Sequence, residues 1–234
     1  MRYTLPHHLA TAKRAPQAPG ADVSIYPPVR RTMVGLLSQP RMSTYLGACA
    51  GDVSAAVDLY RWNMDVSMAL FEAIHYLEVG VRNRADDALT ALAGPTADWL
   101  DAPPTVPLKP TTKSVIQKAR EHASKNGRVA THGHVIAELT LGFWPYLFAE
   151  PYNRTLWAPA LKGAFPTASR TQMHDNLKSI AELRNRLAHH EPVFALQLAG
   201  KYELVLATAE LVDPRLGWWI DATSRVESVL RVRP

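Results

Sequence analysis

Apolar and polar positions along most of the chain repeat with the period of an α-helix. The longest such run is residues 53–92, bounded by Asp52 as an N-cap and by Gly94 with Pro95 at its end. Its apolar positions recur close to every 3.6 residues: Val53, Val57, Tyr60, Met64, Phe71, Ile74, Val81, Ala85, Ala88 and Leu92. The pattern predicts a helix of about 60 Å, which either crosses the whole molecule or kinks at Gly80.

Shorter helical patterns precede and follow this run. They cover residues 29–39, 40–51, 113–127, 134–139, 142–150, 155–165, 169–190, 201–211 and 214–231. Thr111 or Thr112 is expected to cap the helix over 113–127, and Pro192 ends the one that starts near 169. No segment shows sustained strand alternation between hairpin turns, so the fold class predicted is all-α.

The first 28 residues have a different composition from the rest. They contain Pro6, Pro16, Pro19, Pro27 and Pro28, and proline disfavours a helix at the preceding residue. We therefore expect residues 1–28 to form a proline-rich arm, and residues 29–234 to form a single all-α domain.

Composition narrows the function classes only slightly. The 234 residues are 47% apolar and 20% charged, as in globular proteins, and the net charge of +5 is compatible with a polyanionic partner such as RNA. Cys49 is the single cysteine, which excludes an intramolecular disulfide. No apolar run is long enough for a signal peptide or a membrane span, so we expect a cytoplasmic protein without a membrane partner.

The densest group of candidate functional residues is "ELRNRLAHHEP", residues 182–192. Asn185 and His189 are four residues apart and share a helix face, as do Arg186 and His190. Arg184 and His189 are five apart, which places them about 140° apart around an ideal helix. A site using both would need an unwound helix end, or a twofold dimer that brings Arg184 and His189 of two chains into one cleft.

Two interpretations of this segment remain open at this point. In the first, cationic side chains merely complement the negative end of the helix dipole, and the spacing alone favours this view. In the second, His189 performs acid–base chemistry on a phosphodiester, because histidine titrates near neutrality. Arg184 would then bind the phosphate as its negative charge rises.

Other candidate chemistry is weaker. His132 and His134 have a His-x-His spacing without a third ligand nearby, and no phosphate loop or zinc-protease helix occurs, so neither a metal site nor a cofactor is predicted. Glu78 and Arg82 are four residues apart in the long helix and suit an internal ion pair. Arg82 is also a candidate for lining a substrate cleft.

The segment "RNRLAHHEP" resembles the Arg-Asn-x-x-x-His signature of HEPN domains, an all-α ribonuclease superfamily of bacterial defence and toxin systems. The chain is most similar to the abortive-infection (Abi-like) branch. The matching segments, in the same order, are "DLYRWNMDVSMALFEAIHYLEVGVRNRADDAL", "IAELTLGFWPYLF", "RNRLAHHEP" and "WWIDATSRVESVLRVRP". The resemblance covers roughly residues 30–234.

This resemblance implies a HEPN-like helical bundle with additional helices and a homodimer with a composite cleft. Arg184 and His189 would be the catalytic pair, and Asn185, Arg186, His190 and Arg82 would contact the substrate. The implied activity is metal-independent cleavage of RNA by 2′-hydroxyl attack, restrained by an antitoxin or another inhibitory partner. Glu191 stands where some relatives carry a modifiable tyrosine, which argues against that form of regulation.

Two alternatives to the enzyme remain. A catalytically silent HEPN-like module would bind RNA or a protein without cleaving anything. A purely structural helical adaptor would bury and pair the side chains of 182–192 rather than present them to a cleft.

Overall fold

The computed structural model describes residues 27–127 and 129–234, and all regular secondary structure in these residues is helical. The prediction of an all-α fold is therefore confirmed. The predicted arm, residues 1–28, lies outside the described residues except for Pro27 and Pro28, which begin the first helix. Proline is tolerated there because the first residues of a helix have no intrahelical acceptor for their N–H groups.

The chain divides into two compact units, one up to Tyr60 and one from Arg61 onward, and each is described by itself. The first contains α1 (Pro27–Leu36), α2 (Gln39–Ala48) and the start of α3 (Val53–Ala93). Buried Arg30 places its two terminal nitrogens 2.9 Å from the two carboxylate oxygens of Asp58. Asp52 caps α3 as predicted, because its Oδ1 accepts from the backbone N–H of Ser54 at 2.8 Å.

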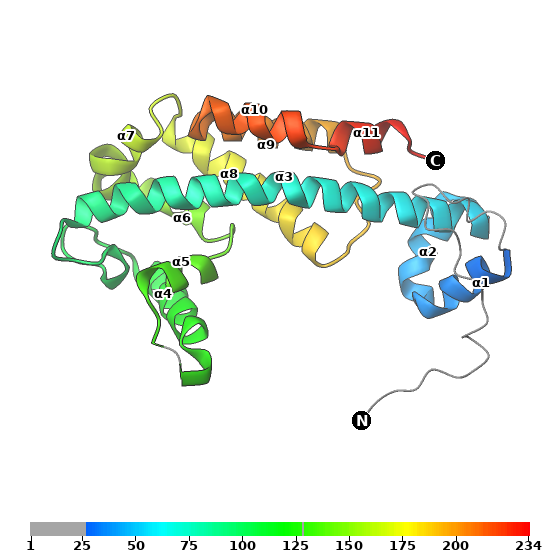
Figure 1. Cartoon of the computed structure of the whole chain (residues 1–234), viewed down its shortest axis with the longest axis horizontal. Helices are drawn as coiled ribbons and strands as arrows, with labels where there is room; N and C mark the ends of the chain where they lie inside the picture. The colour runs from blue at the N-terminus through cyan, green and yellow to red at the C-terminus, as the bar shows by residue number, and fades with distance from the viewer. Residues whose placement is uncertain (1–26, 128) are drawn as a thin grey trace. The chain divides into compact units, whose positions relative to one another are not determined.

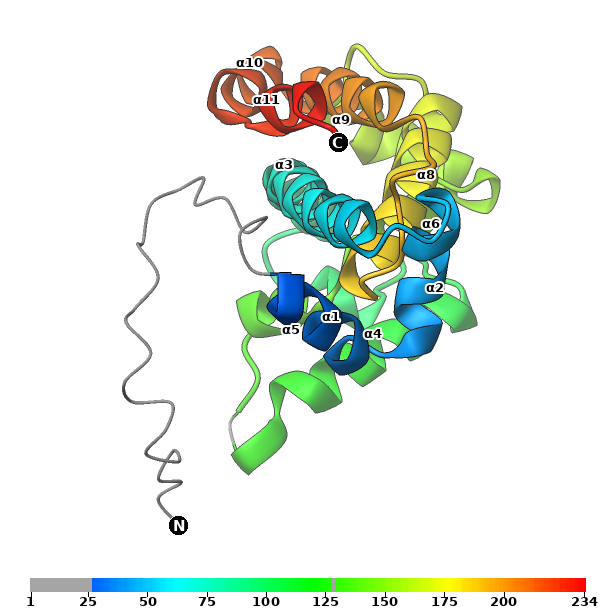
Figure 2. The ribbon, with the colours of Figure 1, turned by 90° about the vertical axis from the view of Figure 1, so that its right-hand side faces the viewer.

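The second unit contains the rest of α3 and all later elements. These are η3 (Trp99–Asp101), α4 (Pro110–Ala123), η4 (Lys125–Gly127), α5 (His132–Glu138), α6 (Trp144–Leu147), η5 (Glu150–Tyr152), η6 (Asn153–Leu161), α7 (Lys162–Ala164), α8 (Arg170–Ala188), α9 (Leu198–Val212), α10 (Pro214–Thr223) and α11 (Val226–Arg231). Within this unit α9, α10 and α11 run along one side of α3, as Figures 1 and 2 show, and α8 packs against α6 and α9.

The long helix α3 continues through Gly80 without a kink (Figure 1). Gly80 is therefore not the site of a bend, and its lack of a side chain serves helix packing instead. A Cβ atom built on it would lie 2.6 Å from Cδ2 of Leu216, inside the contact distance of two carbon atoms. The missing side chain therefore lets α10 approach α3 closely.

The core of the second unit only partly follows the predicted stripes. On α8 the predicted positions Leu177, Ile180, Ala181, Leu183 and Leu187 are all buried. On α3, Ile74, Val81 and Ala85 are buried as predicted, whereas Phe71 is partly exposed. Near Phe71 the predicted apolar positions therefore do not coincide with the buried face of α3. The Phe71 ring is available for a contact outside the apolar core.

Two local structures differ from those expected. The segment 155–165, predicted as a short helical piece, belongs largely to η6, a π-helix with Pro159 inside it. Helix α4 begins at Pro110 after Lys109, so neither Thr111 nor Thr112 is its N-cap. Thr112 is buried instead, with its hydroxyl 2.7 Å from that of Tyr152.

Candidate functional site

The segment 182–192 forms the last turns of α8 and the chain reversal that follows. The backbone N–H of Glu191 donates to the carbonyl of Arg186 at 2.9 Å, and that of His190 donates to Leu187 at 3.0 Å. This pair of bonds is the Schellman motif, with His190 in the position that glycine usually takes. His190 has a φ of +54°, so α8 ends at Ala188, earlier than Pro192 required.

Arg184 points from α8 toward α3. Its guanidinium carbon lies 5.4 Å from the centroid of the Phe71 ring, a cation–π geometry. Its Nε is buried and has no hydrogen-bond partner among the described residues. The residue as a whole is only partly buried.

His189 is the C-cap of α8, and its backbone N–H donates to the carbonyl of Asn185 at 3.0 Å. Because this bond continues the α-helical pattern, the offset between Arg184 and His189 persists to the helix end. The His189 ring is exposed and makes no hydrogen bond or ion pair with the described residues. No contact in the described part of the chain joins Arg184 to His189.

The other predicted substrate-binding residues have different surroundings. Asn185 is exposed and borders a hollow between α8 and α6. Arg186 Nε donates to Oε2 of Glu191 at 3.1 Å, an ion pair across the helix end. His190 is exposed and sits in the left-handed turn, next to His189 in sequence.

Arg82 does not form the predicted ion pair with Glu78. No ion pair among the described residues joins them, and Arg82 Nε donates instead to Oδ1 of Asn83 at 3.4 Å. The spacing allowed the pair, but an exposed pair at this spacing gains only a few tenths of a kcal/mol. Within the described residues, no hydrogen bond or ion pair links Arg82 with Arg184 or His189.

A residue that the sequence interpretation missed fixes the segment after α8. Asn63 of α3 is 1% exposed, and its Oδ1 accepts from the backbone N–H of Val193 at 2.8 Å and of Phe194 at 3.1 Å. These bonds anchor the chain just beyond His189 to α3. The available signal was an asparagine within an otherwise apolar helix face, beside Trp62 and Val66.

A second polar cluster lies around His132, away from the residues of the motif in sequence. His132 Nδ1 lies 3.0 Å from Asp98 Oδ1, and Nε2 lies 2.8 Å from Asp86 Oδ1. Trp99 Nε1 donates to the same Asp86 oxygen at 2.6 Å. Partial burial by itself lowers the pKa of His132, but the hydrogen bonds to Asp98 and Asp86 outweigh it and raise the pKa above the usual value.

This cluster joins three elements rather than forming a metal site. Each ring nitrogen of His132 lies within hydrogen-bond distance of a carboxylate oxygen, and the protonated imidazole, with two N–H donors, is the form that satisfies both carboxylates at once. In the described part of the chain, no group of three or more His, Cys, Asp or Glu side chains is arranged to hold a metal ion.

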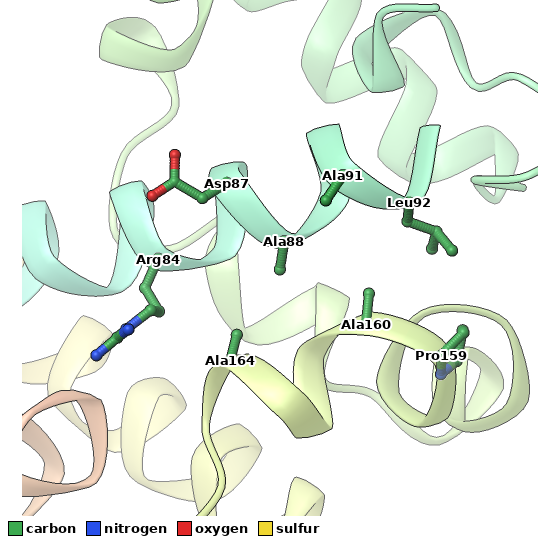
Figure 3. A pocket seen from close by; sticks show the side chains of 8 residues that line it. All are labelled: Arg84, Asp87, Ala88, Ala91, Leu92, Pro159, Ala160 and Ala164. Carbon is green, nitrogen blue, oxygen red and sulfur yellow. The ribbon is translucent and has the colours of Figure 1, made fainter. Parts of the chain in front are cut away.

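A hollow of about 580 Å³ lies between the end of α3 and the η6–α7 segment in the second unit. Figure 3 shows Ala88 and Ala91 of α3 facing Ala160 and Ala164 across it. Arg84 borders the hollow, but its Nη2 already donates to the carbonyl of Val212 at 2.9 Å. Asp87 also lines the hollow, so its surface combines charged side chains with the facing alanines.

Comparisons with protein-family models, with curated proteins and with solved structures find no match to this chain. None of the helices in the described residues combines the length and apolar character needed to cross a membrane. The fold and the motif geometry define an all-α protein with an arginine and a histidine at the end of α8. Its function is proposed on that basis.

Proposed function

We propose that this protein is a metal-independent endoribonuclease of a toxin or antiphage system, of the HEPN type, acting in the cytoplasm. Its catalytic pair would be Arg184 and His189. The observation that carries the proposal is the His189 ring at the C-cap of α8, exposed and without a hydrogen-bond partner among the described residues. A histidine in this state is free to exchange protons with a bound substrate.

The proposed reaction is transesterification within the RNA strand. His189 takes the proton from a ribose 2′-hydroxyl, and the 2′-oxygen attacks the adjacent phosphorus. The bond to the 5′-oxygen breaks and that oxygen receives a proton, leaving a 2′,3′-cyclic phosphate and a 5′-hydroxyl. Arg184 stabilises the negative charge that builds on the phosphate oxygens. DNA lacks the nucleophile and is not cleaved.

A homodimer supplies the missing geometry in this proposal. Arg184 packs over Phe71 while His189 faces solvent on another side of the same helix end. Placing α8 ends of two chains against each other would let Arg184 of one and His189 of the other meet at one phosphate. An antitoxin or other inhibitory partner would restrain such an enzyme by covering this cleft.

The test incubates the purified protein with structured and unstructured RNA, with and without EDTA. His189→Ala should lower the cleavage rate by about 10²–10⁴-fold without loss of helical signal. His75→Ala, at an exposed histidine of α3, is the matched control and should cleave like the wild type. Cleavage that requires a divalent cation, or that survives His189→Ala, would refute the proposed mechanism.

A second candidate is a catalytically silent HEPN-like module that binds RNA or a protein. Two observations favour it. The Nε of Arg184 is buried, which keeps a substrate from reaching that atom, and the cation of Arg186 is already paired with Glu191. The same assay separates the two candidates. Tight RNA binding with no cleavage of any RNA by the wild type supports the silent module.

A further inference from the structure

Tyr146 is the exposed aromatic side chain of α6. It is 60% exposed, whereas its neighbours Trp144 and Leu147 are fully buried. These buried side chains hold the short helix in place, so the Tyr146 ring is presented by a fixed backbone. Its hydroxyl has no hydrogen-bond partner among the described residues.

Hollows adjoin Tyr146 on two sides. Toward α8 lies one of about 370 Å³, lined by His174, Lys178, Glu182 and Asn185. Toward α4 lie two more, of about 400 Å³ and 250 Å³, which share Val115 and Phe143. Tyr146 lines all three, so they form one groove, hereafter the Tyr146 groove, that runs from α8 to α4.

Two exposed lysines line hollows that Tyr146 also lines. Lys178 belongs to α8 and Lys118 to α4, and neither forms an ion pair with the described residues. The glutamates of the groove are Glu182 and Glu138, and Oε2 of Glu138 lies 3.9 Å from His122 Nδ1. An aromatic platform with two unpaired cations along the same groove fits a base with a phosphate on either side.

The polar end of the groove suits the edges of bases. Asn185 presents a donor and an acceptor, the pair that recognises adenine, and the Glu182 carboxylate accepts from exocyclic amino groups. Only an unpaired base offers both its face and its edge in this way, because a duplex keeps its bases stacked on each other. Asn185 also directly follows Arg184, so a strand bound here reaches the proposed catalytic helix end.

We propose that the Tyr146 groove binds single-stranded RNA, with one unpaired base stacked on the Tyr146 ring. Lys178 and Lys118 contact the phosphates on either side of that base, and Asn185 and Glu182 contact base edges. This inference rests on the proposed function for its ligand class, and it assigns the substrate-binding surface that leads to the α8 end.

The test measures RNA binding rather than cleavage. The full-length His189→Ala protein is titrated into fluorescein-labelled single-stranded RNA of about ten nucleotides, and Kd is obtained from anisotropy. Tyr146→Ala should weaken binding by about 5- to 150-fold, the equivalent of one lost base stack. Tyr146→Phe keeps the ring and should bind within about twofold of the parent protein. A blunt RNA duplex of the same length should bind more weakly than the single strand.

Two further variants distinguish RNA binding in the Tyr146 groove from non-specific binding elsewhere on the surface. Trp218→Ala removes another exposed aromatic ring, 69% exposed on α10, and should leave Kd unchanged. Lys178→Ala should weaken binding and reduce the dependence of Kd on salt. Equal Kd values for Tyr146→Ala and the parent, equal losses for Tyr146→Ala and Tyr146→Phe, or no RNA binding at all would each overturn the inference.

The outcomes also distinguish this inference from the proposed function. Binding that depends on Tyr146 in a wild-type protein that cuts no RNA would leave the groove intact and refute the ribonuclease. If cleavage depends on His189 but RNA binding does not depend on Tyr146, the ribonuclease is supported and the role of the Tyr146 groove is refuted.

Discussion

The guanidinium carbon of Arg184 lies 5.4 Å from the centre of the Phe71 ring, so α8 and α3 meet at the proposed catalytic arginine. The contact is electrostatic as well as apolar, because the ring face is electron-rich. It sets the direction of an otherwise flexible side chain.

Replacing Phe71 by leucine should therefore impair catalysis without removing a catalytic group. Phe71→Leu keeps most of the apolar volume but loses the ring, and we expect the single-turnover cleavage rate to fall by about twofold to thirtyfold. Phe71→Tyr retains the ring and should cleave at the parental rate. Equal rates for the leucine and tyrosine variants would mean that the ring does not position Arg184.

His190 holds a backbone conformation that glycine adopts more easily. Its φ of +54° costs an L-residue about 1–2 kcal/mol, so His190→Gly should raise the free energy of unfolding by about 1 kcal/mol in urea denaturation. If His190 also contacts RNA, the more stable variant will cleave more slowly. A variant that is both more stable and fully active would remove His190 from the site.

Asn63→Ala should destabilise the protein, because it leaves the N–H groups of Val193 and Phe194 buried without acceptors. Each orphaned group costs about 1–3 kcal/mol, so we expect a loss of at least about 2 kcal/mol on urea denaturation. Cleavage at low temperature should fall as well, since the chain beyond His189 loses its anchor. Asn83→Ala, at an exposed asparagine of α3, is the control and should change little.

The cluster around His132 predicts a dependence of stability on pH. The pKa of His132 is raised in the folded protein. The stabilisation that its protonated ring gives to the folded state is therefore fully present below the unfolded pKa of about 6.5, and it is lost as the pH rises through the folded pKa. The difference in unfolding free energy between wild type and His132→Ala should therefore shrink as the pH rises above about 6.5. His122→Ala removes an exposed histidine and should change the free energy of unfolding less than His132→Ala does. A constant difference for His132→Ala would contradict the charged bridge.

The helical periods of the sequence predicted the all-α class, the cap at Asp52 and the buried stripe of α8. They could not predict the role of Gly80, because a glycine in a helix marks a bend or a close approach equally well, and only the position of Leu216 decides. The π-helix around Pro159 was also beyond a pattern built on 3.6 residues per turn.

For the candidate site, the sequence predicted the offset between Arg184 and His189 but not what each side chain meets. The contact with Phe71 and the anchor at Asn63 join residues more than 100 positions apart, for which periodicity contains no information. Glu191 shows the same limit locally. Its ion pair with Arg186 depends on the turn at His190, which the helical period does not predict.

The bond between Asn63 and the backbone of Val193 spans 130 positions, and this has a consequence for the order of events during synthesis. The ribosome releases α3 first, and contacts between distant segments form only after the later one has emerged. The end of α8 is thus fastened to α3 only after Val193 has emerged from the ribosome. A nascent chain that has not yet released this segment lacks the fixed helix end on which the proposed catalytic pair depends.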